Sequence, residues 1–112
     1  MDEKVFLKIP LFRDIPAEAM ANIVSSLPTA VHRAGEYLFR EGDHGEHLYV
    51  VQEGQLEVVL APDSPDEMLL KVIGPGEYVG EMGLILRDGK RTASVRSQTA
   101  SKTWVMSREV FA

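Results

Sequence analysis

The amino-acid sequence predicts a mainly β domain, an antiparallel sandwich or barrel that follows one short helix. The chain has 112 residues, which is close to the commonest size of a single domain. From Thr29 onward, runs of β-branched and aromatic residues alternate with glycine-containing turns. Strands spaced about 8–12 residues apart are typical of β sandwiches and barrels. Before Thr29, apolar residues instead recur with the period of a helix.

The expected helix lies in a segment of about residues 10–27. Four apolar residues follow the i, i+3, i+4, i+7 spacing of one helical face: Met20, Ile23, Val24 and Leu27. Pro16 suits the first helical position. Pro28 ends the helix, because proline has no N–H to bond with the preceding turn.

The β segment is expected over about residues 29–106. Five runs have the composition of strands: Tyr37–Arg40, Leu48–Gln52, Leu56–Leu60, Met68–Ile73 and Thr92–Ser97. Glycine turns separate these runs, His32 lies in an earlier strand, and residues 62–67 form a polar hairpin connection. Ser107 is a good helix N-cap, so a C-terminal helix is expected to begin over residues 107–112 and to continue beyond them.

Composition narrows the range of functions. Lys and Arg number 12 against 17 Asp and Glu, and a net charge of −5 argues against direct contact with nucleic acid. The absence of cysteine excludes disulfides, thiolate metal ligands and cysteine nucleophiles. No apolar run approaches the roughly 18 residues that a membrane span needs. We expect a cytoplasmic domain, or the cytoplasmic domain of a membrane protein. No enzymatic role is expected, since no nucleophile–base arrangement stands out.

Residues 79–95 combine a glycine, an acid and an arginine in an order that can surround a small anion. Gly80 lets the backbone approach a ligand closely. Glu81 begins a short helical stretch whose first N–H groups can bind an anion. Arg91 can donate two N–H groups to that anion, while Glu81 would accept from a neighbouring hydroxyl, as in a ribose phosphate. Alternatively, Glu81 and Arg91 pair with each other, a contact that contributes only ~0–1 kcal/mol in water.

The same segment resembles the phosphate-binding cassette of the cyclic nucleotide-binding domain family, which includes the bacterial catabolite activator and protein kinase A regulatory subunits. The matching positions are Gly80, Glu81, Met82, Gly83 and Leu84, then Arg91, Thr92, Ala93 and Ser94. Upstream segments that resemble the family's scaffold are Pro10–Phe12, Gly35, Gly42-Asp43, Leu48–Val51 and Gly54–Val58. The resemblance covers nearly the whole chain, taken as one domain of residues 1–112. It implies an antiparallel β roll of jelly-roll type with short flanking helices and a truncated C-terminal lid helix.

The resemblance also implies a ligand and the residues that bind it. Glu81 would bind the ribose 2′-hydroxyl and Arg91 the cyclic phosphate. The other ligand-binding positions are Gly80, Met82 and Ala93, the backbone N–H groups of Gly83, Leu84 and Thr92, and the pocket-lining Val58, Leu70, Lys71 and Val79. We expect cAMP as the ligand, with cGMP tolerated, because a hydroxyl at Thr92 can bond the guanine amino group.

These implications describe a non-catalytic cyclic nucleotide sensor, without a cofactor, that regulates an effector domain in the same or a partner chain. The missing C-terminal helix could form a homodimer. One alternative is a β-roll interaction module that no longer binds nucleotide, which intact Glu81 and Arg91 argue against. Another is a cupin-type metal site. The two-residue gap between His44 and His47, with no later histidine, departs from the cupin pattern, so no metal site is expected.

Overall fold

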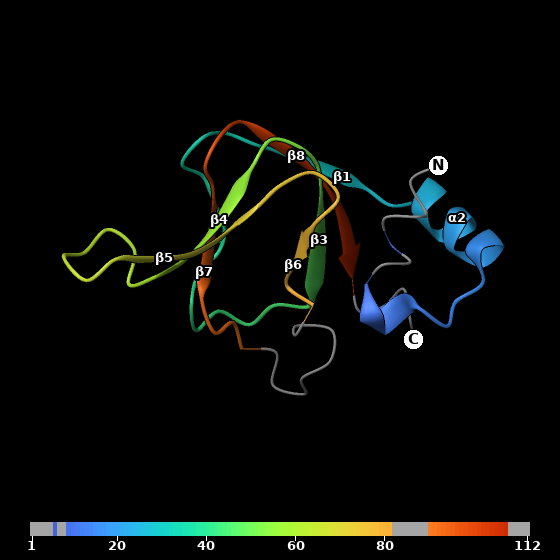
Figure 1. The fold of residues 1–112 in the computed structure, drawn as a ribbon, viewed down its shortest axis with the longest axis horizontal. Coiled ribbons are helices and arrows are strands. Elements are labelled where there is room, and N and C mark those ends of the chain that lie inside the picture. The colour runs from blue at the N-terminus through green and yellow to red at the C-terminus, as the bar shows by residue number, and fades with distance from the viewer. Residues whose placement is uncertain (1–5, 7–8, 82–89, 108–112) are drawn as a thin grey trace.

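The computed structural model of this protein describes Phe6, residues 9–81 and residues 90–107 (Figure 1). Among the described residues, the 3-10 helix η1 (Pro10–Phe12) and the α-helix α2 (Ala17–Ser25) precede the strands. The strands that follow in the described residues are β1 (Thr29–His32), β2 (Tyr37–Phe39), β3 (His47–Glu53), β4 (Leu56–Leu60), β5 (Met68–Ile73), β6 (Tyr78–Val79), β7 (Ser94–Ser97) and β8 (Ser101–Ser107).

The described strands form two antiparallel sheets of four strands each. Their orders are β1-β8-β3-β6 and β2-β7-β4-β5, so each sheet joins strands that are distant in the sequence. In the first sheet β8 pairs with both β1 and β3. In the second β4 lies between β7 and β5. The predicted mainly β, antiparallel fold class is confirmed.

The helical segment packs on one face of the β1-β8-β3-β6 sheet. Met20 of α2 is fully buried there, and Ile23, Val24 and Leu27 pack against the same apolar cluster. The predicted apolar face is confirmed for the first three residues, whereas Leu27 lies beyond the helix, which ends at Ser25. Residues of β3 and β8 complete the cluster from the sheet side: Leu48, Val50 and Met106. The helix begins at Ala17, one residue later than predicted, because Pro16 occupies the N-cap position.

A second apolar cluster lies between the two sheets. Its buried members come from both sheets: Val51, Leu56, Ile73, Val79 and Val95. Side chains alternate along a strand, so β3 contributes Leu48 and Val50 to the helical side and Tyr49 to the cluster between the sheets. Burying an aliphatic side chain contributes about 1.5–3 kcal/mol. This cluster therefore fixes the distance between the sheets, and with it the space that the site occupies.

The predicted bounds of two strands match those of β4 and β5, whereas β6 and β8 are not predicted. In β8 the buried positions include the small polar residues Ser101 and Thr103, which hide the alternation that marks a half-buried strand. The Thr103 hydroxyl lies 3.0 Å from Nε2 of buried His32, which satisfies both groups. Ser107 closes β8 opposite His47. The residues after it, where the sequence predicts a C-terminal helix, lie outside the described part of the chain.

Strand β5 forms an edge of its sheet and carries exposed apolar side chains. Met68 is 55% exposed, Leu69 52% and Leu70 50%. Figure 1 shows the β4–β5 hairpin projecting from the body of the domain. Arg96 of β7 ties this hairpin back, because its Nη1 and Nη2 donate to the two carboxylate oxygens of Glu67 at 2.9 and 3.0 Å.

Candidate functional site

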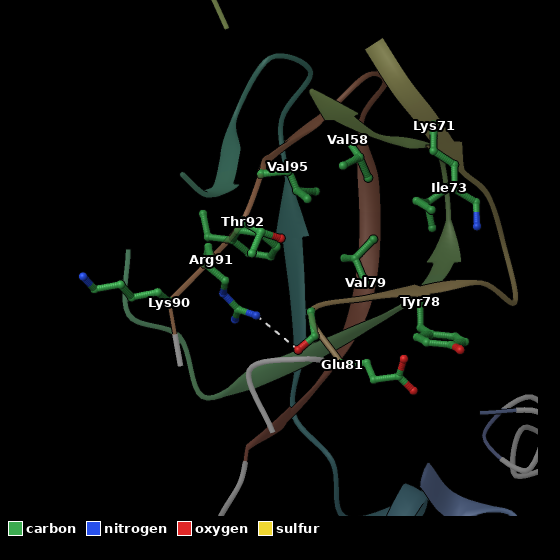
Figure 2. Close-up of a pocket in the computed structure, with 13 residues that line it drawn as sticks. Val58, Lys71, Ile73, Tyr78, Val79, Glu81, Lys90, Arg91, Thr92 and Val95 are labelled. Carbon is green, nitrogen blue, oxygen red and sulfur yellow. Dashed lines mark hydrogen bonds between the residues drawn. The ribbon is translucent and has the colours of Figure 1, made fainter. Parts of the chain in front are cut away.

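A cavity of about 250 Å³ lies where the two sheets meet, next to the second apolar cluster (Figure 2). Strands β2, β4, β5, β6 and β7 and the segments after β6 and before β7 all contribute to its wall. The lining residues are Phe39, Val58, Lys71, Ile73, Tyr78, Val79, Gly80, Glu81, Lys90, Arg91, Thr92, Ala93 and Val95. The lining thus combines apolar side chains from several strands with charged side chains of both signs.

The backbone of Arg91 is held by the turn between β2 and β3. Its N–H donates to the Asp43 carbonyl at 2.8 Å, and its own carbonyl accepts from the Gly42 N–H at 2.8 Å. Gly42 has a φ of +89°, a left-handed conformation that favours glycine. The turn thus fixes the point from which the arginine side chain enters the site.

The Arg91 side chain is only 6% exposed and is held on three sides. Nη1 donates to the Gly80 carbonyl at 3.1 Å, and Nη2 donates to the His47 carbonyl at 2.8 Å. The guanidinium carbon lies 4.0 Å from the centre of the Phe39 ring, within the range of a cation–π contact. The guanidinium is thus buried and oriented by neutral partners.

The electrostatic state of Arg91 is unusual for a buried cation. Burial lowers the pKa of Arg91, with Tyr49 and Asp43 acting in the opposite direction. Among the described residues no carboxylate forms an ion pair with it, and its buried Nε–H has no hydrogen-bond partner. Buried charges are ordinarily paired, and a buried donor without a partner costs about 1–3 kcal/mol. A buried guanidinium with neutral partners and an unbonded N–H is a group suited to bind an anion.

Glu81 reaches the cavity from the end of β6. Figure 2 shows its carboxylate on the side of Tyr78, away from the Arg91 guanidinium. Burial raises the pKa of Tyr78, and the charge of Glu81 raises it further. Within the described residues Glu81 and Arg91 form no ion pair, so the alternative in which the two residues neutralise each other is not observed.

Two constraints favour glycine at position 80, which precedes Glu81 and contacts Arg91. Its φ is +88°, and a Cβ there would lie 2.7 Å from the His47 carbonyl oxygen and 3.0 Å from Nη1 of Arg91. A side chain at this position would therefore strain the backbone and push on the arginine.

The structure brings most of the predicted site residues to this one cavity: Val58, Lys71, Val79, Gly80, Glu81, Arg91, Thr92 and Ala93. Met82, Gly83 and Leu84 lie outside the described residues. Leu70 is not among the lining residues, which departs from its predicted role in the pocket. The pairing of β4 with β5 shifts register here, so that Val58 faces Lys71 and Val59 faces Leu69. Leu70 is the extra residue of this bulge, and its side chain is half-exposed.

Several lining residues are absent from the sequence-based prediction: Phe39, Ile73, Tyr78, Lys90 and Val95. Ile73 lies two residues after Lys71 on β5, so strand alternation could have placed both on the same wall. Phe39 comes from β2, far from the cassette in sequence, and no local pattern signals its contact with Arg91.

The histidines do not form a metal site in the described residues, where no three His, Asp or Glu side chains converge. His32 is buried in contact with Thr103, and His44 and His47 are exposed. In the same described part of the chain, no helix has both the length and the apolar character to cross a membrane.

Comparison with known proteins identifies the family. The family model for the cyclic nucleotide-binding domain matches residues 30–112, and this chain belongs to that family. It is 35% identical over 89 residues to cGMP-dependent protein kinase, isozyme 1, of Drosophila melanogaster, which covers 78% of this chain and 12% of the kinase. The chain therefore spans about an eighth of the length of that relative.

Solved structures support the same fold. The N-terminal domain of a transcriptional regulator from Streptomyces coelicolor superposes with a TM-score of 0.83 at 35% identity, over 99% of this chain and 76% of that one. The cAMP-bound structure of PfPKA-R (141-441) superposes with a TM-score of 0.86 at 25% identity, over 98% of this chain and 39% of that one. The β roll implied by the sequence resemblance is thus confirmed.

Proposed function

We propose that this chain senses a cyclic nucleotide, cAMP in preference to cGMP, in the cavity beside Arg91, and passes occupancy to an effector domain in the same or a partner chain. The buried guanidinium of Arg91 carries the proposal. It has lost its hydration, has no ion-pair partner among the described residues and retains an unbonded Nε–H. A phosphate supplies the negative charge and the acceptor oxygens that such a group needs.

The remaining cavity residues suit the rest of such a ligand. Glu81, an acceptor-only group when ionised, would take the hydrogen of the ribose 2′-hydroxyl. Val58, Val79 and Val95 offer an apolar wall to the sugar and the purine. The cavity volume of about 250 Å³ is slightly below the roughly 300–1,000 Å³ typical of small-molecule sites. Similarity to a cGMP-dependent kinase and to cAMP-bound PfPKA-R also supports a cyclic nucleotide.

The switching behaviour follows from linkage. A ligand can shift the equilibrium between two states of a regulator only as far as its affinities for those states differ. We expect the chain by itself to bind nucleotide. A change in an attached effector requires, in addition, an element that contacts both the site and the effector.

Thr92 provides the test of base preference. It lines the cavity and is exposed, so its hydroxyl can reach the guanine amino group of cGMP. We expect Thr92→Ala to weaken cGMP binding more than cAMP binding. An equal loss for both nucleotides would mean that Thr92 contributes its backbone N–H alone.

Isothermal titration calorimetry of the purified chain with cAMP and with cGMP tests the proposal. Saturable binding at one site per chain, tighter for cAMP, is the expected result. No binding at millimolar nucleotide would refute the proposal and favour an interaction module. Tight retention of zinc or iron by the same preparation would instead point to a metal site.

A further inference from the structure

We infer that Gly45 is a positioning residue for Arg91, because the guanidinium occupies the space that any side chain at residue 45 would need. Gly45 lies in the connection between β2 and β3, outside the cassette and outside the residues that line the cavity. A Cβ built on its backbone would overlap Nε, Cζ and Nη2 of Arg91. The effect on ligand affinity rests on the proposed function, whereas the position of the arginine does not.

The requirement for glycine here is one of space and not of backbone conformation. Gly42, in the same connection, has a φ of +89° and open space around its Cβ position, so its conformation explains it. Gly45 has no positive φ, and a larger residue could adopt its backbone conformation. The three heavy atoms nearest to a Cβ at this position all belong to the Arg91 guanidinium.

Arg91 cannot move aside without losing its contacts. Its head group is stacked on Phe39 and bonded to the carbonyls of Gly80 and His47. The Cβ position of Gly80 is itself only 3.0 Å from Nη1, so the head group fills space that the absence of a side chain at both glycines leaves open.

The connection that contains Gly45 cannot retreat freely either. Asp43 accepts the backbone N–H of Arg91 at 2.8 Å, and His47 accepts its Nη2 at 2.8 Å. These two carbonyls lie on either side of Gly45 in the sequence. If the connection moves outward to make room for a side chain, it takes at least one of these acceptors away from Arg91. Either response displaces the guanidinium from the place where it would meet a phosphate.

The position of the arginine is measured first, without ligand. The Nε–H signal of Arg91 in a ¹H–¹⁵N spectrum is assigned by its absence in Arg91→Lys. We expect Gly45→Ala to move this signal while leaving the backbone spectrum of β4 and β5 unchanged. Gly74→Ala is the matched control, because a Cβ at Gly74 lies 3.7 Å from Glu77 Oε1, an ordinary contact. An Nε–H signal that stays in place in Gly45→Ala overturns the inference.

Affinity is measured next, by calorimetry with cAMP. Gly45→Ala should bind at least tenfold more weakly than the unmodified chain, and Gly74→Ala should bind as the unmodified chain does. In an Arg91→Ala background, Gly45→Ala should change affinity less than twofold further. An equally large further loss in that background would show that Gly45 acts independently of Arg91, against the inference.

Two outcomes separate this inference from the proposed function. If the unmodified chain binds no cyclic nucleotide, the proposed function fails and the Nε–H signal alone decides the inference. If Gly45→Ala is too unstable to study, adding Arg91→Ala should recover its Tm, because the overlapping group is gone. Failure to recover would locate the clash elsewhere and overturn the inference.

Discussion

Removing the guanidinium of Arg91 should abolish most of the affinity for cyclic nucleotide. The side chain is 6% exposed, so a phosphate bonded to it would be shielded from water. Hydrogen bonds to charged groups contribute about 1.5–3 kcal/mol each, which corresponds to roughly 10- to 150-fold in affinity. We therefore expect Arg91→Ala to bind cAMP at least tenfold more weakly.

Arg91→Lys separates charge from shape in the same contact. Lysine retains the positive charge but lacks the planar pair of donors, and it cannot bond the carbonyls of Gly80 and His47 in the same way. Its affinity should fall between those of the unmodified chain and Arg91→Ala. Arg33→Ala is the control for net charge, because Arg33 is exposed and does not line the cavity.

Calorimetry at constant salt measures all four proteins, and thermal unfolding confirms that each is folded. Unchanged affinity in Arg91→Ala would place the phosphate elsewhere and refute the reasoning. A loss of the same size in Arg33→Ala would attribute the effect to net charge and not to the site.

Three further predictions concern the ribose, the core and the hairpin. Glu81→Ala should weaken cAMP binding about tenfold or more, yet bind 2′-deoxy-cAMP no more weakly than cAMP. Leu56→Ala, at a fully buried site between the sheets, should lower the free energy of unfolding in urea by about 2–5 kcal/mol. Hydrogen bonds from Arg96 lower the pKa of Glu67 from 4.5 to about 2. A carboxyl group whose pKa is lowered on folding stabilises above its ordinary pKa, so Glu67→Gln should flatten the loss of stability as the pH falls from 4.5 towards 2.

Each of these has a result that would count against it. If loss of the 2′-hydroxyl weakened binding by the same factor in the unmodified chain and in Glu81→Ala, Glu81 would not contact the ribose hydroxyl. The roughly 2–5 kcal/mol typical of such changes includes the cost of a cavity. If Leu56→Ala lowered the free energy of unfolding by less than about 1 kcal/mol, the two sheets would have moved together to fill the space left by the side chain. Identical acid unfolding of Glu67→Gln and the unmodified chain would show that the Arg96 contact does not persist in solution.

Local periodicity in the sequence predicted the elements that consist of one continuous run of residues with a single pattern. The apolar face of α2 and the bounds of β4 and β5 follow from the sequence, since each of these elements has a continuous run of suitable residues. Strand β8 escaped prediction because Ser101 and Thr103 fill buried positions that apolar residues ordinarily occupy. The Ser101 hydroxyl bonds the Gln55 carbonyl and the Thr103 hydroxyl bonds His32, and no sequence pattern predicts these distant pairs.

The candidate site shows the same division between local and distant information. Glu81 and Arg91 were predicted from the order of residues in one segment, and the structure places both on one cavity. The partners that orient Arg91 could not be predicted. The carbonyl of His47 lies 44 residues away in sequence, and a backbone carbonyl has no sequence signature. Leu70 does not line the cavity, whereas Lys71 and Ile73 of the same strand do, because neighbouring residues of a strand point to opposite faces.

Lys71 occupies two environments at once, and this limits how the domain can be redesigned. It lines the cavity, and it is the one charged residue of the six in β5, an edge strand whose outer side pairs with no other strand in the described residues. Charged residues on open edges oppose sheet-to-sheet aggregation. Replacing Lys71 with leucine to make the cavity more apolar would leave an uninterrupted apolar edge, of the kind that nucleates aggregates. The polarity of the cavity wall and the protection of the sheet edge therefore depend on the same ammonium group, and variants that change the cavity at Lys71 must be screened for aggregation by light scattering.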